Sequence, residues 1–187
     1  MQIRAHLHTV NLHRRLVRQY CFRLGLYWQG LIHDLSKYSH TEFWRGAKYF
    51  QGYRSPNDQE RIEKGVSMSW LHHKGRNRHH FEYWIDYCRD AEGKTYMGGC
   101  KMPMKYVGEM FCDRIAACRV YQGENYTDAS PLAFFLRSKD HILIHPETGA
   151  LIERWLVLLR DEGEEQAFRL IRQELRDEKE KNRQRKA

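Results

Sequence analysis

Apolar side chains recur at helical spacing along most of this 187-residue chain. Such stripes are typical of helices that bury one face against a core. The chain contains four prolines and few β-branched residues, which argues against an all-β fold. Its length is sufficient for one sizeable hydrophobic core. The sequence therefore predicts an all-α fold, a single-domain helical bundle.

Glycines, prolines and polar runs set the expected limits of these helices. A polar loop is expected over 51–58, and a Gly-containing loop near the mouth of a site over 89–102. Gly163 is expected to divide the last two helices, and the charged end of the chain, 176–187, is expected to fray. The expected helices span 6–26, 29–38, 42–50, 59–73, 79–88, 103–121, 131–141 and 147–160, with a last helix after Gly163.

The charge, the apolar runs and the cysteine spacing of the chain limit the partners and the cellular compartment that we expect. The net charge of +8 would attract polyanions such as nucleotides. Lys and Arg form few aligned stripes, so nucleic acid as a partner is not favoured. No apolar run approaches the roughly 18 residues of a membrane span, so neither a membrane partner nor a secretory signal is expected. The five cysteines are scattered without a CxxC pair, which indicates reduced thiols in a cytoplasmic protein.

An imidazole and a carboxylate stand side by side in the segment 31–38. Leu31, Asp34, Leu35 and Tyr38 follow helical spacing, so Asp34 is expected on the apolar stripe of one helix. Burying a carboxylate costs free energy unless it is paired or bound to a metal. His33 and Asp34 are therefore candidate ligands for a divalent metal, provided that other helices supply further donors.

Other expected helices also place metal-capable side chains on inward stripes. His13 follows Val10 in one of them, His73 follows Trp70 in another, and Asp113 lies on a third. Each alone would be read as a core histidine or a paired carboxylate. Together they predict one metal centre, because each unpaired group would cost free energy. The turn after His73 adds His79 and His80.

The ordered set of histidines and aspartates resembles the HD superfamily of metal-dependent phosphohydrolases. Residues 33–37 (HDLSK) look like its HD-x-x-K motif. Residues 13–17 look like the helix of its first histidine, and residues 110–115 like the helix of its last aspartate. The His-rich segment 72–84 is similar to that of a poorly characterised group of small HD-like proteins. The resemblance covers roughly residues 6–122. The GYP residues of the cyclic-di-GMP phosphodiesterases are absent, so that activity is not supported.

The resemblance implies a domain organisation and a ligand set. Residues 1–125 would form the metal-binding core. Residues 126–187, for which the family offers no counterpart, are expected to form a helical extension packed on the same domain. One or two ions would bind, with Mn, Fe, Mg, Co, Ni and Zn all compatible with mixed imidazole and carboxylate ligands. Asp34 would bridge two ions, with His79 as the alternative to His80. The implied ligands are His13, His33, Asp34 and Asp113 for a first ion, and His73 and His80 for a second.

Further roles follow from charge and position. Lys37 lies one turn after His33, where it would contact a phosphate oxygen, although a solvated lysine is the alternative. His79 would act in catalysis by contacting phosphate if it is not a ligand. Arg76 and Arg78 would hold further phosphates or lie in a solvated turn.

Glu82 would orient a ligand histidine or lie at the surface. Tyr83, Trp84 and Tyr87 would stack on a base or form aromatic core. His6 and His8 are weaker rivals of His13, and His40 is expected at the surface.

The function expected from this resemblance is a metal-dependent phosphohydrolase that acts on a nucleotide or another small phosphate ester. Two alternatives remain open. One is a di-iron oxygenase on the same scaffold, and the other is a degenerate nucleotide-binding or regulatory protein. The sequence is compatible with a homo-oligomer.

Overall fold

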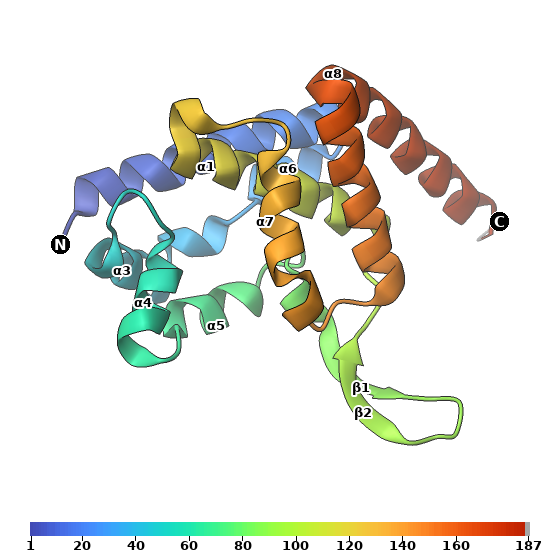
Figure 1. Cartoon of the computed structure of the whole chain (residues 1–187), viewed down its shortest axis with the longest axis horizontal. Helices are drawn as coiled ribbons and strands as arrows, with labels where there is room; N and C mark the ends of the chain where they lie inside the picture. Colours follow the sequence, from blue (N-terminus) through green and yellow to red (C-terminus); the bar gives the residue numbers. More distant parts are fainter. Residues whose placement is uncertain (186–187) are drawn as a thin grey trace.

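The computed structural model describes residues 1–185, and within them the chain is mostly helical. The predicted all-α class is confirmed, with one small antiparallel hairpin added (Figure 1). No helix in these residues has both the length and the apolarity needed to cross a membrane. The elements are α1 (Ile3–Arg23), α2 (Tyr27–Ile32), η1 (Leu35–Tyr38), α3 (His40–Tyr49), α4 (Pro56–Lys64), α5 (Met68–Lys74), η2 (Phe81–Trp84), β1 (Ile85–Arg89), β2 (Thr95–Gly99), α6 (Met104–Gln122), η3 (Gly123–Asn125), α7 (Ser130–Ser138), η4 (Lys139–His141) and α8 (Pro146–Gln184).

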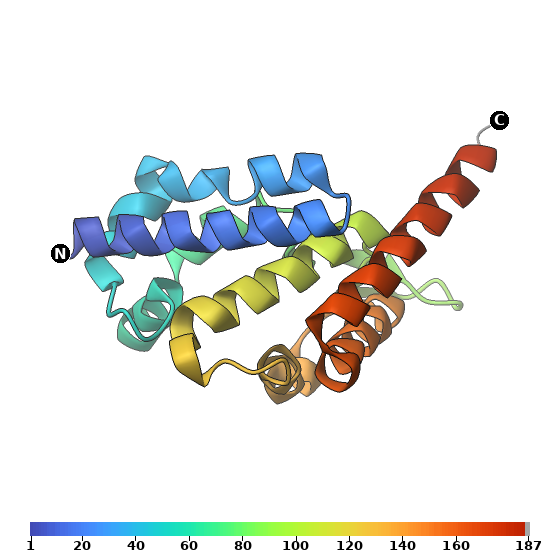
Figure 2. The same ribbon diagram turned by 90° about the horizontal axis from the view of Figure 1, so that it is seen from above.

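Helix α1 lies between α2 and α6 and contacts both (Figure 2). Its fully buried Val17 and Cys21 belong to the same core cluster as Phe111 and Ile115 of α6. Burying such side chains contributes about 1.5–3 kcal/mol each before entropy is counted. This packing fixes the two helices that carry the first and last residues of the predicted site.

Helix α8 completes the core from the other side of α6. Its Trp155 and Leu159 are fully buried in the same cluster, and so is Ile171 beyond the bend. Gly163 has φ 76° and ψ 171°, so it interrupts the helix where the sequence predicts a division. The second half turns away from the body of the molecule (Figures 1 and 2). The expected fraying over 176–187 is wrong as far as Gln184, where the helix ends, and residues 186–187 lie outside the described part.

The segment 29–38 is not one helix, and its predicted apolar stripe is wrong. Helix α2 ends at Ile32, and Asp34 adopts a left-handed conformation with φ 53° and ψ 27° before η1 begins. The expected stripe neighbours Leu31 and Leu35 are 50% and 51% exposed, whereas Asp34 is 1% exposed. Asp34 is buried because the chain turns inward there. The guanidinium group of Arg14 on α1 holds this turn by donating to the carbonyl oxygen of His33 at 2.8 Å.

The expected helix over 59–73 is divided into two. Gly65 ends α4 with φ 73°, a conformation that glycine adopts without strain. Ser67 then caps α5 by accepting a hydrogen bond from the backbone N–H of Trp70 at 3.0 Å. Ile62 and Val66, which were expected to face inward, are 60% and 46% exposed. His73 is buried as predicted, at 2% exposure, on the shorter helix α5.

The expected helix over 79–88 is replaced by η2 and by strand β1. Strand β1 pairs with β2, so the expected loop over 89–102 contains a strand. Asp90 closes the hairpin by accepting a hydrogen bond from the backbone N–H of Lys94 at 2.8 Å, and Gly93 supplies φ 82°. The hairpin projects from the helical body (Figure 1).

Candidate metal centre

Three segments bring together a first donor group, which consists of His13, His33, Asp34 and Asp113. Nε2 of His13 on α1 lies 2.9 Å from Oδ1 of Asp113 on α6 and 3.6 Å from Oδ2 of Asp34. Nε2 of His33 lies 3.4 Å from the same Asp34 oxygen and 3.5 Å from Oδ1 of Asp113. The four residues predicted for a first ion therefore converge on one point.

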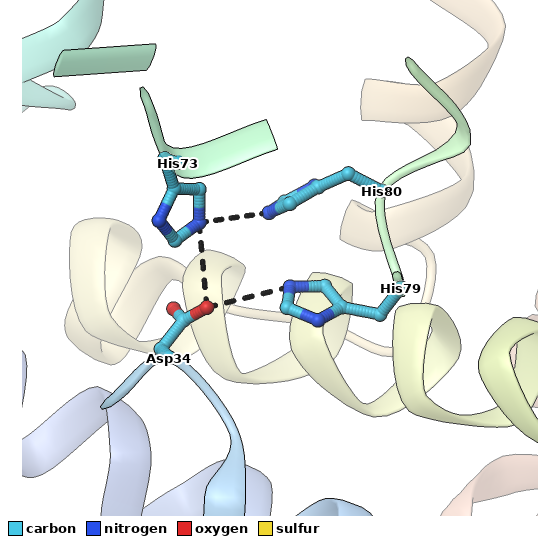
Figure 3. Close-up of side chains that lie close together, drawn as sticks. All are labelled: Asp34, His73, His79 and His80. Atoms are coloured by element: carbon cyan, nitrogen blue, oxygen red, sulfur yellow. Dashed lines mark hydrogen bonds and ion pairs between the residues drawn. The ribbon is translucent and has the colours of Figure 1, made fainter. Parts of the chain in front are cut away.

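A second donor group consists of Asp34, His73, His79 and His80 (Figure 3). Oδ1 of Asp34 lies 3.3 Å from Nε2 of His73 and 3.4 Å from Nε2 of His79. Nε2 of His80 lies 2.9 Å from Nε2 of His73. The sequence left His79 and His80 as alternatives, but the structure brings both into the group.

Asp34 is common to the two donor groups and divides its oxygens between them. Oδ2 faces the first group and Oδ1 faces the second. Its left-handed backbone is the only positive φ among the non-glycine residues of 1–185. Backbone conformations of this kind are concentrated at functional sites. The turn thus places one carboxylate between two sets of imidazoles.

Two buried glutamates hold the outer nitrogens of these histidines. Oε1 of Glu109 lies 2.9 Å from Nδ1 of His33 and 3.0 Å from Nδ1 of His79. Oε2 of Glu42 lies 2.7 Å from Nδ1 of His73. A carboxylate only accepts hydrogen bonds, so Nδ1 of each ring carries the donated proton. The Nε2 lone pairs are thereby aimed inward, as in carboxylate–histidine–metal arrangements.

Neither glutamate is predicted as a site residue from the sequence. Glu109 lies four residues before Asp113, on the same face of α6, and this spacing is the signal that would have found it. For Glu42 the sequence predicts only that it begins the helix expected over 42–50. The sequence analysis offered Glu82 for this role, with a position at the surface as the alternative. In residues 1–185 no hydrogen bond joins Glu82 to a histidine, and its side chain is partly buried.

The carboxylates favour positive charge at this point of the molecule. Burial alone would raise the pKa of Asp34, but the charges of His33, Lys37 and His73 hold it well below its usual range. Burial likewise opposes the charged form of His33, but Asp34 and Asp113 raise its pKa well above the usual value. Burial, followed by the neighbouring His79 and His73, lowers the pKa of His80.

The donor atoms fit a metal ion in chemistry and in spacing. Nε2 of His13, His33 and His79 and both oxygens of Asp34 are buried and make no hydrogen bond of normal geometry within residues 1–185. Leaving such atoms unpaired costs about 1–3 kcal/mol each. Ligands about 2.1 Å from a shared ion lie about 3.0–3.4 Å apart in octahedral or tetrahedral geometry, close to the 2.9–3.6 Å separations of the first group.

The charge of the centre also favours a bound cation. With the histidines in the neutral form that a metal ligand requires, the two aspartates and two glutamates of the centre carry four negative charges against the single positive charge of Lys37. Nζ of Lys37 lies 2.7 Å from Oδ2 of Asp34. One or two divalent cations would neutralise most of the remaining charge.

The other predicted site residues lie around the centre or away from it. Arg76 and Arg78 are exposed on the turn before His79. Arg76 donates to the carbonyl oxygen of His72, and Arg78 to the hydroxyl group of Tyr106. Neither forms an ion pair within residues 1–185, and their role with phosphate stays a prediction.

The rival histidines and the aromatic residues are distributed differently. His6 is buried against Phe43 and Phe50, whereas His8 and His40 are exposed. None of these three belongs to a donor group. Trp84 packs on the core, which agrees with the expectation of an aromatic core residue. Tyr87 is 73% exposed on the hairpin.

Comparison with known proteins gives a family but no described activity. No curated protein and no solved structure matches the chain. Residues 2–157 match the model of a family described as a family of unknown function (DUF5662). The match includes every residue of both donor groups and covers most of the 187 residues. The protein therefore belongs to this family of unknown function, DUF5662.

Proposed function

We propose that this protein is a metal-dependent phosphohydrolase that acts on a nucleotide or another small phosphate ester. One observation carries the proposal, namely the convergence of two buried donor groups that share the carboxylate of Asp34. A complete set of imidazoles and carboxylates, with outer nitrogens held by Glu42 and Glu109, argues against a degenerate site. The ordered motif in the sequence supports the HD type of hydrolase.

Some residues of the centre are buried and would act as metal ligands, whereas others lie at an edge that is partly exposed to solvent. His33, Asp34 and His79 are each 1% exposed, which suits them to hold ions away from bulk water. His80 and Asp113 are only partly buried, and the side chain of Lys37 is 28% exposed. The substrate would therefore approach along this open edge.

Each group then has a role that follows from its position. When bound, divalent ions supply an acidified water and neutralise charge that develops on phosphorus-bound oxygens. His13, His33, Asp34 and Asp113 would hold one ion, and Asp34, His73, His79 and His80 the other. His79 acts as a holder in this proposal, because both of its nitrogens are directed at carboxylates.

The cationic side chains would bind the phosphate. Lys37 lies beside Asp34 at the open edge, where its ammonium group would neutralise a phosphate oxygen as charge increases in the transition state. Arg76 and Arg78 are exposed and not paired with acids in residues 1–185, so their charge is available to the distal part of the substrate. The overall charge of +8 favours an anionic substrate in the same way.

Elemental analysis of the purified protein tests the metal centre, and a phosphate-release screen with Mn, Fe, Co and Mg tests the activity. The matched variants are His13→Ala and His8→Ala, both on α1, of which only the first alters a donor group. We expect His13→Ala to lose metal and activity and His8→Ala to keep both. Absence of metal from the wild type, or full hydrolysis by Asp34→Ala, would overturn the proposal.

A di-iron oxygenase is the second candidate, because the second donor group contains three imidazoles, and imidazole also suits iron. Iron-dependent oxygen uptake without phosphate release would favour it. Tight nucleotide binding without turnover, in a protein whose stability is insensitive to chelators, would instead favour the regulatory alternative.

A further inference from the structure

Glu109 occupies an unusual position for a helical glutamate. It lies on α6 one turn before Asp113 and is only 5% exposed. Oε1 accepts a hydrogen bond from Nδ1–H of His33 at 2.9 Å and lies 3.0 Å from Nδ1 of His79. Within residues 1–185 it has no other hydrogen-bond partner and no ion pair with a lysine or an arginine. Such a buried carboxylate is costly unless its interactions repay the loss of hydration.

The two histidines that Glu109 holds belong to different donor groups. Nε2 of His33 faces Oδ2 of Asp34 at 3.4 Å, in the first group. Nε2 of His79 faces Oδ1 of Asp34 at 3.4 Å, in the second. The ring centroids are 4.3 Å apart and the ring planes are tilted by 36°, so the two rings are in direct contact. One glutamate oxygen therefore fixes one ring in each half of the centre.

We propose that Glu109 is a positioning residue that couples the two metal positions. By interacting with the Nδ1–H group of both rings, it aims the two Nε2 lone pairs into opposite halves of the centre at once. This inference rests on the metal centre of the proposed function, but it does not depend on the reaction. It assigns to α6 two connected tasks, since Asp113 supplies a ligand and Glu109 orients two others.

Glu42 provides an internal contrast. Oε2 of Glu42 accepts a hydrogen bond from His73, and Oε1 accepts one from His72 at 2.6 Å. His72 belongs to neither donor group. Glu42 therefore contacts ligands of the second group only, whereas Glu109 contacts ligands of both.

The same atoms admit one other arrangement. Nδ1 of His33, Nδ1 of His79 and the carboxylate of Glu109 lie close enough to hold an ion themselves. A neutral imidazole has one lone pair on nitrogen, so a ring bound through Nδ1 cannot also present a lone pair at Nε2. An ion at Glu109 would therefore take His33 and His79 away from the two donor groups. As a hydrogen-bond acceptor, the carboxylate instead leaves both Nε2 lone pairs available to those groups.

Metal titration of three proteins separates these roles. Wild type, Glu109→Gln and Glu42→Gln are dialysed against increasing Mn²⁺, and bound metal is counted by elemental analysis. Glutamine keeps the size of the side chain but removes the charge that strengthens the hydrogen bonds. Losing a group that orients ligands typically weakens metal binding by about 10–100-fold. We expect Glu109→Gln to weaken both binding steps by this factor and Glu42→Gln to weaken only one.

NMR spectroscopy tests the same role of Glu109 without reference to activity or to the number of bound ions. In the Zn²⁺-loaded wild type, ¹⁵N NMR should show the Nδ1–H tautomer for both His33 and His79. Both signals should change in Glu109→Gln and neither in Glu42→Gln. Circular dichroism establishes that each variant is folded. If Glu109→Gln fails this check, Glu109→Asp, which is too short to reach both rings, replaces it with the same expectation.

The outcomes separate this inference from the proposed hydrolase. Unchanged binding of both ions by Glu109→Gln, or loss of one ion only, overturns the coupling role even if the wild type hydrolyses phosphate esters. A third ion in the wild type that Glu109→Gln alone loses also overturns it. Weakening of both steps in a protein that hydrolyses nothing supports the role of Glu109 and removes the proposed activity. A wild type that binds no metal removes both.

Discussion

The backbone of Asp34 decides how the centre is built, because only the left-handed turn brings its carboxylate between the two donor groups. An L-residue pays about 1–2 kcal/mol for this conformation, and glycine does not. We therefore expect Asp34→Gly to be more stable than Asp34→Ala by about 1 kcal/mol. Urea unfolding of the two variants without metal measures the difference.

The control for this comparison lies on α7. Ala133 is exposed in the middle of that helix, where glycine lowers stability by about 1 kcal/mol relative to alanine. Ala133→Gly should therefore be less stable than the wild type, which is the opposite order. If Asp34→Ala is also more stable than Asp34→Gly, the turn at position 34 does not have the left-handed geometry.

His6 should make folding stability depend on pH. Burial, followed by the charge of Lys37, lowers its pKa from 6.5 to about 4. Above pH 6.5 it is neutral in both the folded and the unfolded chain. As the pH falls from 6.5 to 4, His6 becomes protonated in the unfolded chain but stays neutral in the folded chain. The free energy of unfolding therefore decreases.

We expect this loss to reach about 1–2 kcal/mol, allowing for partial solvent screening. The measurement is the free energy of unfolding of wild type and His6→Leu in urea from pH 7 to pH 5. The wild type should lose more stability than the variant across this interval. Parallel curves for the two proteins would contradict the prediction.

At the scale of the helix, the close approach of α1 to α3 depends on Gly46. A Cβ atom at this position would lie 2.3 Å from Nε2 of His6, which is itself buried. Gly46→Ala should therefore destabilise the protein by about 1–3 kcal/mol through overpacking. A double-mutant cycle with His6→Ala provides the check, since the added methyl group should cost much less when the ring is absent. Equal costs in both backgrounds would show that the helices meet elsewhere.

Helical spacing predicted the elements that bury one continuous face, and it failed where polar contacts set the path. Helices α1 and α6 agree closely with their stripes because Val17, Phe111 and similar side chains enter one core. The inward turn at Asp34 is held by Arg14, and the break before α5 by the capping hydroxyl of Ser67. Spacing carries no signal for either interaction.

The candidate site was predictable to the extent that its residues resemble a known motif. His13, Asp113 and the other expected ligands converge as the motif implied. Glu42 and Glu109 were missed because a glutamate in a helix is usually solvated, and only the three-dimensional contacts reveal that these two are buried.

At the scale of the whole molecule, the centre joins segments that the chain keeps far apart. The candidate ligands come from α1, from the turn after α2, from α5 and the turn that follows it, and from α6. The carboxylates of these segments repel one another when no cation is present, whereas a shared ion attracts them all. Metal binding should therefore stabilise the folded chain as one unit.

Thermal unfolding with and without metal tests this coupling. An ion present at about 100 times its Kd stabilises the folded state by about 2.7 kcal/mol. For a chain of this size that corresponds to a rise in Tm of roughly 5–10 °C, and EDTA should reverse it. Asp34→Asn keeps the shape of the side chain but removes the charge shared by both donor groups, so its Tm should respond little to Mn²⁺. An equal rise in this variant would mean that the ion binds elsewhere on the protein.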